Sequence, residues 1–160
     1  MPQKITPNLW FDTQAEEAAE FYCSVFKNSR IISKAPYPET SDRAGTLVTV
    51  EWELDGQRFV GINGGPNFKF DEAISLSISC ADQEEVDYYW ERLTDGGEES
   101  MCGWLKDRYG LSWQVVPEGM DELFSDPDPE RSNRAWKAMM GMRKLDVAAL
   151  RSAADGVPAP

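Results

Sequence analysis

The chain has 160 residues, enough for one domain with a buried core or for two small fused modules. Its 28 acidic residues outnumber the 16 Lys and Arg residues, giving a formal net charge of −12. Because nucleic acids and anionic membranes recruit cationic side chains, this balance argues against both as partners, and no apolar run approaches the ~20 residues of a membrane span.

The first half of the sequence predicts a strand, a helix and three further strands. The first strand, 5–11, alternates, which places Leu9 and Phe11 on one face and Asn8 and Trp10 on the other. A capping box beginning at Thr13 opens the helix, which ends at 28–30. The remaining strands are expected at 31–35, 46–54 and 57–63.

The second half repeats this order after a break at Gly64-Gly65-Pro66, which marks the boundary between the halves. The expected elements are a strand at 73–80, a helix capped by Asp82, a short strand near Ser100 and a hairpin of strands at 104–109 and 112–116. Each half reads β-α-β-β-β. Since one such unit buries only one face of its sheet, two units must pair to form a stable core.

Residues after Pro117 predict a helical appendage. The pairs Asp126-Pro127 and Asp128-Pro129 each offer an N-cap followed by proline at the first helical position. Asp146 caps a last helix, which stops at Gly156. The appendage carries a stripe formed by Trp136, Met139, Met140 and Arg143. Either the appendage covers the sheet or its exposed edge, or the Trp and Met side chains of the stripe meet a second subunit. The predicted fold is therefore α+β, with tandem βαβββ modules at 1–65 and 66–118 and a helical tail at 119–160.

Few residue clusters in the sequence indicate catalysis. The three cysteines, Cys23, Cys80 and Cys102, form no CxxC pair and are typical of free thiols in a reducing, cytoplasmic compartment. Cys102 as a nucleophile would need a base such as histidine, and the chain has no histidine. Glu51 and Glu53 share one strand face about 7 Å apart, where a solvated edge is favoured over an acid/base pair.

Three stretches carry a family resemblance: ITPNLWFD, FDEAISLSISCADQEEVDYYWERLTDGG and CGWLKDRYGLSWQVVP. They resemble the vicinal-oxygen-chelate superfamily of glyoxalase and bleomycin-resistance proteins, and within it the PhnB-like, 3-demethylubiquinone 3-methyltransferase-like branch. The resemblance implies a cup between two curved sheets and a homodimer. The branch description implies group transfer to a quinone-like or phenolic substrate, although the glycine cluster at 64–65 does not lie between a strand and a helix as an S-adenosylmethionine loop would.

The resemblance also implies where a metal would be held. In metal-dependent relatives, four His, Glu or Gln ligands project into the cup, and the corresponding positions here are Thr6, Gly61, Ala73 and Gln114. Only Gln114 has a side chain able to coordinate, whereas a catalytic metal normally has three protein ligands. No metal and no cofactor are expected, and a metal-dependent lyase or dioxygenase is disfavoured.

The expected cup lining combines aromatic walls with a few hydroxyls and amides. Its candidate ligand-binding residues are Asn8, Trp10, Phe59, Gly61, Phe68, Phe70, Ser75, Ser77, Trp104 and Gln114. Such a lining suits an uncharged or weakly polar small molecule, although aromatics at these spacings more often belong to a core or an interface than to a pocket. The sequence thus favours metal-independent binding of a small, partly apolar ligand by a cytoplasmic homodimer, and leaves open whether the chain is an enzyme.

Overall fold

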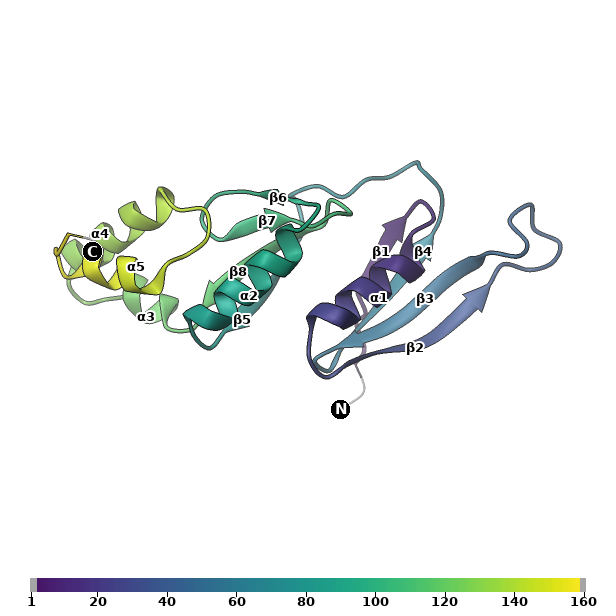
Figure 1. The fold of residues 1–160 in the computed structure, drawn as a ribbon, viewed down its shortest axis with the longest axis horizontal. Helices are drawn as coiled ribbons and strands as arrows, with labels where there is room; N and C mark the ends of the chain where they lie inside the picture. The colour runs from purple at the N-terminus through teal and green to yellow at the C-terminus, as the bar shows by residue number, and fades with distance from the viewer. Residues whose placement is uncertain (1–2, 159–160) are drawn as a thin grey trace. The chain divides into compact units, whose positions relative to one another are not determined.

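The computed structural model describes residues 3–158. The chain folds into two compact units, one ending at Phe70 and one beginning at Asp71 (Figure 1). The first unit contains β1 (Asn8–Phe11), α1 (Ala15–Val25), β2 (Ser29–Pro36), β3 (Leu47–Leu54) and β4 (Gln57–Asn63). The second contains β5 (Ser75–Cys80), α2 (Gln83–Thr94), β6 (Glu98–Glu99), β7 (Trp104–Lys106) and β8 (Ser112–Pro117), followed by α3 (Met120–Phe124), α4 (Pro129–Met140) and α5 (Val147–Ala154).

The two sheets have the same topology. The strand order is β1-β4-β3-β2 in one and β5-β8-β7-β6 in the other, and in each the first and last strands of the repeat pair in parallel. Neither sheet closes into a barrel. The predicted α+β class and the βαβββ repeat are therefore confirmed.

Stacked aromatic rings fill the space between α1 and the first sheet. Trp52, fully buried on β3, stacks on Tyr22 of α1 and on Phe59 of β4, with ring centroids 6.0 and 5.9 Å apart. The predicted capping box is wrong, because the N-cap is Gln14 and no side chain caps the helix. The first free amide, that of Ala15, instead donates 2.9 Å to Oδ1 of Asn63, so a tertiary contact replaces the local cap.

In the second unit, helix α2 begins as the sequence predicts. The Asp82 carboxylate accepts a hydrogen bond from the amide of Glu85, and the Glu85 side chain accepts one from the amide of Ala81, which completes a reciprocal cap. The hairpin differs from the prediction, because β7 ends at Lys106. The carboxylate of Asp107 draws the chain into a loop over 107–111 instead of a two-residue turn.

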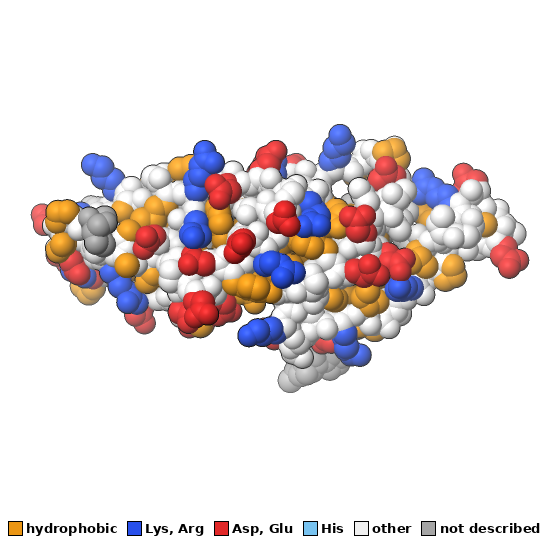
Figure 2. Space-filling model, in the orientation of Figure 1, with side chains coloured by type: hydrophobic (Ala, Val, Ile, Leu, Met, Phe, Trp, Pro, Cys, Tyr) orange, Lys and Arg blue, Asp and Glu red, His pale blue; other side chains and the backbone are white. Residues whose placement is uncertain are grey.

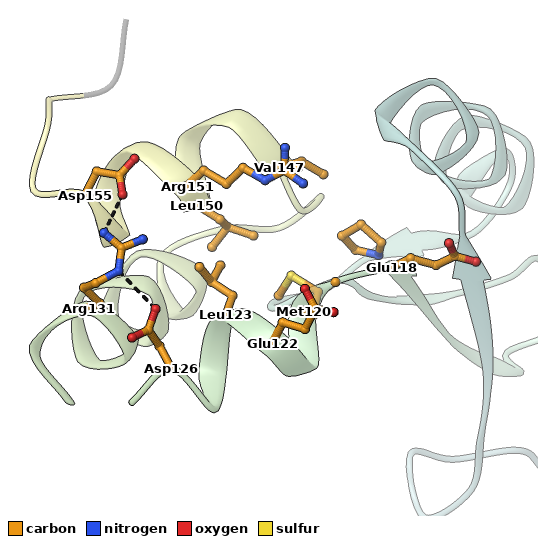
Figure 3. A pocket seen from close by; sticks show the side chains of 12 residues that line it. Glu118, Met120, Glu122, Leu123, Asp126, Arg131, Val147, Leu150, Arg151 and Asp155 are labelled. Atoms are coloured by element: carbon orange, nitrogen blue, oxygen red, sulfur yellow. Dashed lines mark hydrogen bonds and ion pairs between the residues drawn. The ribbon is translucent and has the colours of Figure 1, made fainter. Parts of the chain in front are cut away.

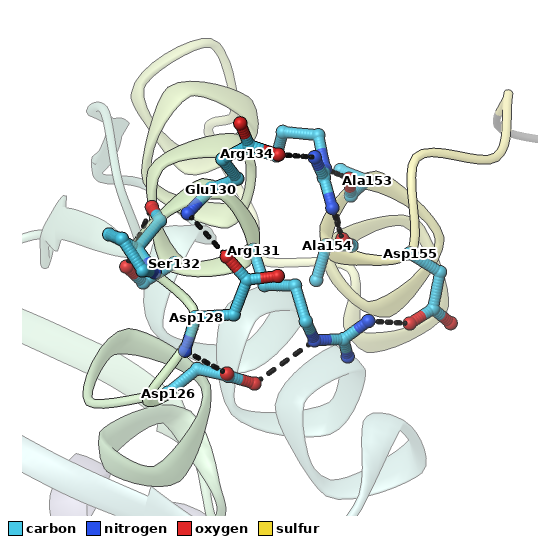
Figure 4. Close-up of polar contacts among 10 residues, drawn as sticks. Asp126, Asp128, Glu130, Arg131, Ser132, Arg134, Ala153, Ala154 and Asp155 are labelled. Carbon is cyan, nitrogen blue, oxygen red and sulfur yellow. Dashed lines mark hydrogen bonds and ion pairs between the residues drawn. The ribbon is translucent and has the colours of Figure 1, made fainter.

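The helical tail is tied together by side chains that satisfy helix ends (Figure 4). Asp128 caps α4 at the predicted Asp-Pro pair, and Arg134 donates to the carbonyls of Ala153 and Ala154 at the C-terminus of α5. The sequence did not reveal the short α3. The predicted stripe on α4 is largely exposed, since Trp136 and Met140 are 55% and 50% accessible.

The tail belongs to the second unit. Gln83 at the start of α2 donates to the carbonyl of Leu145 and accepts from the amide of Val147. Leu145 also packs with Met120 and Leu150 in an apolar cluster. A second subunit at the exposed side of α4 stays a prediction.

Charged side chains of both signs are visible on one face of the protein. On the face shown in Figure 2, Lys and Arg side chains lie among Asp and Glu and form no continuous basic stripe. Within residues 3–158, no helix combines the length and the apolarity that crossing a bilayer requires.

Candidate functional site

Four of the expected ligand-binding residues lie on one sheet face, the face opposite α2. Ser75 and Ser77 on β5, Gln114 on β8 and Trp104 on β7 reach this face through strand alternation, since Ser77 and Trp104 are both register partners of Gln114. Gln114 Nε2 donates to Ser75 Oγ at 2.9 Å. Trp104 is half-buried and Ser77 is exposed. The amide and hydroxyl are thereby held in place by each other, beside an aromatic ring.

A hollow of about 120 Å³ opens at one end of this face. Its lining residues are Glu72, Glu98, Glu99, Ser100, Trp104, Leu105, Lys106 and Ser112. Ser112 is fully buried, yet its Oγ has no hydrogen-bond partner among the described residues. Such a group costs free energy unless a ligand or water satisfies it. No sequence motif singles out Ser112, because one serine in a strand forms no pattern.

Lys106 lies beside Ser112 in the sheet register and forms an ion pair with Glu72. Hydrogen bonding to Glu72 raises the pKa of Lys106 above its usual value, and the same contact lowers the pKa of Glu72. Both groups are therefore charged at neutral pH. The ion pair is one side of the hollow.

In the first unit, Asn8 and Trp10 share the face opposite α1. Trp10 Nε1 donates 2.9 Å to the carbonyl of Gly65, and its ring meets Phe68 edge-on at 4.9 Å. Asn8 donates to the carbonyl of Thr6 at 2.9 Å. Because the indole N–H is already used, Trp10 offers a ring surface and no free donor, while Phe68 is 64% exposed beside it.

Phe59 and Gly61 do not lie on the Trp10 face, which corrects the sequence prediction. A Cβ on Gly61 would lie 2.8 Å from the Trp52 ring, and Phe59 stacks on that same ring beneath α1. The β4 residues opposite β1 on the Trp10 face are Val60 and Ile62. Successive residues of a strand point to opposite faces of the sheet, so an error of one residue in the alternation of β4 places Phe59 and Gly61 on the wrong face.

Phe70 also differs from its predicted place in the cup lining. Its ring lies edge-on to Phe11 at 5.4 Å, and Phe11 is buried on the α1 side of the first sheet. Phe70 is half-buried. It therefore adds to the core of the first unit.

The two glutamates of β3 are ion-paired rather than solvated at an edge. Glu51 pairs with Arg58 and accepts from Ser33 Oγ at 3.2 Å, and Glu53 pairs with Arg30 at 3.1 Å. Strand β3 lies between β2 and β4, so it is not an edge strand. Each carboxylate is committed to a cation, which removes the reason to assign them an acid/base role.

The β2–β3 loop adds a contact that the sequence did not indicate. Arg43 Nη1 donates to the hydroxyl of Tyr37 and to the carbonyl of Asn63, at 3.2 and 3.3 Å, and its guanidinium lies 5.7 Å from the Tyr37 ring centroid. These contacts hold the loop against the end of β4.

The side chains at the family's metal positions do not fit a metal centre. Gln114 donates its amide to Ser75, Gly61 faces α1, and Thr6 and Ala73 bring no carboxylate or imidazole. In residues 3–158, no three His, Cys, Asp or Glu side chains lie close enough together to bind one ion. No chemical step is therefore assigned to a metal.

The cysteines show no catalytic arrangement. Burial raises the pKa of the Cys80 thiol to about 12, with the nearby Glu85 carboxylate adding to the effect. Cys102 Sγ lies 3.7 Å from the Met140 sulfur, a contact that provides no base. Neither thiol is arranged as the nucleophile of a Cys–base pair.

A larger hollow, of about 320 Å³, lies among the tail helices (Figure 3). Met120, Leu123 and Leu150 point into it, and at one end Arg131 bridges Asp126 and Asp155. None of the described polar side chains that line it is a buried group without a hydrogen-bond partner. This hollow lacks the unsatisfied buried group that distinguishes the one beside Ser112.

The sequence profile of a family described as 3-demethylubiquinone-9 3-methyltransferase matches residues 3–116. Among solved structures, the PhnB protein from Bacillus cereus is 38% identical, with a TM-score of 0.66 over 72% of this chain and 99% of that one. A protein from Pseudomonas aeruginosa is 20% identical, with a TM-score of 0.62 over 73% of this chain and 98% of that one. A comparison with curated protein sequences finds no significant match.

A more distant structure is the fosfomycin resistance protein FosX from Listeria monocytogenes, solved with Mn(II) and sulfate. It is 14% identical, with a TM-score of 0.53 over 76% of this chain and 94% of that one, and this likeness shows the fold alone. The profile match spans both βαβββ units and stops before the helical tail. The chain therefore belongs to the PhnB-like family described as 3-demethylubiquinone-9 3-methyltransferase.

Proposed function

We propose that this protein binds a small, partly apolar molecule on the face opposite α2, without a metal ion. The observation that carries the proposal is the hollow beside Trp104, where the fully buried Ser112 hydroxyl has no hydrogen-bond partner within residues 3–158. A buried polar group costs free energy unless it is hydrogen-bonded, so a ligand that reaches Ser112 recovers that cost. A homodimer and a cytoplasmic location remain part of the proposal.

The rest of the face supports the same function. Trp104 supplies an aromatic surface, and the Gln114–Ser75 hydrogen bond fixes two polar groups beside it before any ligand arrives. Ligand sites generally combine apolar area with a few such fixed polar groups. Preorganisation lowers the entropy lost on binding. In the first unit, Trp10 and Phe68 provide a second ring surface.

The first prediction is that a metabolite screen will find compounds that raise the melting temperature and change tryptophan fluorescence. Substituting Ser112→Ala is expected to weaken such a compound about tenfold, the effect of one lost hydrogen bond. Ser79→Ala is the matched control, because Ser79 is an exposed serine of β5 that does not line this hollow. Binding that is equally strong in both variants would place the ligand elsewhere.

A second candidate function is group transfer to a quinone-like or phenolic acceptor, favoured by the description of the matching family. A methyl transferase must bind its methyl donor, so calorimetry with S-adenosylmethionine gives a direct test. We expect no heat of binding, because the Gly64–Gly65 stretch follows β4 and leads into no helix. A saturable exothermic or endothermic isotherm would instead support this second function.

A further inference from the structure

We infer that the ligand of the hollow beside Ser112 carries an ammonium group on a short apolar arm. This inference rests on the proposed function and specifies its ligand class. It follows from three features of the lining: its charge, the unpartnered hydroxyl and the aromatic ring.

The lining is acidic after its internal pairs are counted. The lining residues include three with carboxylates, Glu72, Glu98 and Glu99, and one with an ammonium, Lys106. Glu72 neutralises Lys106. Glu99 is engaged by the indole N–H of Trp90 at 2.8 Å and by Arg143 at 3.7 Å.

The carboxylate of Glu98 is the negative charge of the lining that these pairs leave without a counter-charge. It lies opposite Lys106 in the β6–β7 register, and within the described part of the chain it forms no ion pair. A cation entering the hollow gains this carboxylate as a counter-charge. An anion would have to displace Glu72 from Lys106 while facing Glu98. Coulombic energy therefore favours a positive ligand.

The polar and aromatic groups match an ammonium in particular. The Ser112 oxygen can accept a hydrogen bond, and an ammonium has N–H groups to donate. The half-buried Trp104 ring lies in the same lining and can attract a cation to its face. A quaternary ammonium, which has no N–H, would leave Ser112 unpartnered.

The volume of the hollow limits the size of the ligand group that can enter it. At roughly 30 Å³ for each water molecule, 120 Å³ corresponds to about four waters. That space takes an ammonium group and the first few carbons attached to it, with the remaining apolar part lying outward along the face toward Gln114, the register partner of Trp104.

The test compares three probes that share one phenylbutyl arm and differ in the head group: 4-phenylbutylamine, 4-phenylbutanol and 5-phenylpentanoate. Calorimetry at neutral pH and low salt on the full chain is expected to show the amine binding at least about tenfold more tightly than the other two. Its affinity should fall as salt is added, because the attraction to Glu98 is screened.

Substitutions at the lining residues test whether the amine binds in this hollow. Ser112→Ala and Glu98→Gln should each weaken the amine about tenfold. The matched charge control is Glu91→Gln, an exposed position on α2 that should leave the affinity unchanged. Equal or tighter binding of the alcohol or the carboxylate, still sensitive to Ser112→Ala, would overturn the ammonium assignment and leave the proposed function standing. Failure of every probe and every screened metabolite to bind would overturn both.

Discussion

Replacing Asp107 by alanine is expected to destabilise the second unit by about 3 to 5 kcal/mol. The Asp107 carboxylate is 2% exposed and accepts from the amides of Tyr109 and Leu111 and from the indole N–H of Trp113, at 2.9, 3.1 and 2.9 Å. Alanine removes the acceptor of all three donors at once. Each buried donor left without a partner costs about 1 to 3 kcal/mol.

The measurement is urea unfolding followed by circular dichroism, with Asp95→Ala as the control. Asp95 contacts Arg108 at 3.4 Å, but its side chain is 80% exposed, so its loss should change stability by less than about 0.5 kcal/mol. Asp107→Asn should fall between the two variants, because it keeps one oxygen as an acceptor. If Asp107→Ala is no more destabilising than Asp95→Ala, the carboxylate does not hold the hairpin.

This carboxylate also bears on the binding face. The loop it organises connects β7, which carries Trp104 and Lys106, to β8, which carries Ser112 and Gln114. Loosening the loop would disturb the register of those two strands. We therefore expect Asp107→Ala to lose ligand binding as well as stability.

The sequence predicted the fold correctly because local signals and the tertiary structure agree. The alternation of β5 and the Asp82 cap of α2 both depend on neighbours within a few residues, and the structure has both. At Thr13 the local sequence signal and the tertiary structure disagree. The local capping motif is displaced by Asn63, a residue 48 positions away from Ala15, and no pattern near the helix reveals that partner.

The candidate site was harder to predict for the same reason. Ser75, Gln114 and Trp104 could be assigned to one face, because each lies in a strand of clear alternation. Phe59 and Gly61 were assigned to the wrong face, because β4 is apolar on both sides and its parity is set by pairing with β1. Ser112 became significant only through the absence of a partner, which is a property of packing.

Replacing Gly97 by alanine is expected to destabilise the second unit by about 3 kcal/mol, the upper part of the usual range for overpacking. A Cβ at Gly97 would lie 2.1 Å from the carbonyl oxygen of Lys106 and 2.9 Å from the carbonyl carbon of Asp107. These are backbone atoms, and no rotamer change can move them aside.

The obstructing backbone is also held in place from both sides. Lys106 pairs with Glu98 on β6 and with Ser112 on β8, so the methyl group can be accommodated only if β6 separates from β7. Gly141→Ala is the matched control, because the nearest atom to its added Cβ is the carbonyl oxygen of Ala138 at an ordinary 3.7 Å.

Urea unfolding should show a lowered midpoint for Gly97→Ala and little change for Gly141→Ala. Because Glu98 and Lys106 both line the hollow beside Ser112, a displaced β6 should weaken amine binding in the folded Gly97→Ala protein. A variant that kept the wild-type midpoint would show that β6 can move away from β7 without cost. The close packing of Gly97 on β7 would then have no part in shaping the hollow, and Glu98 could not be treated as a fixed counter-charge for the ligand.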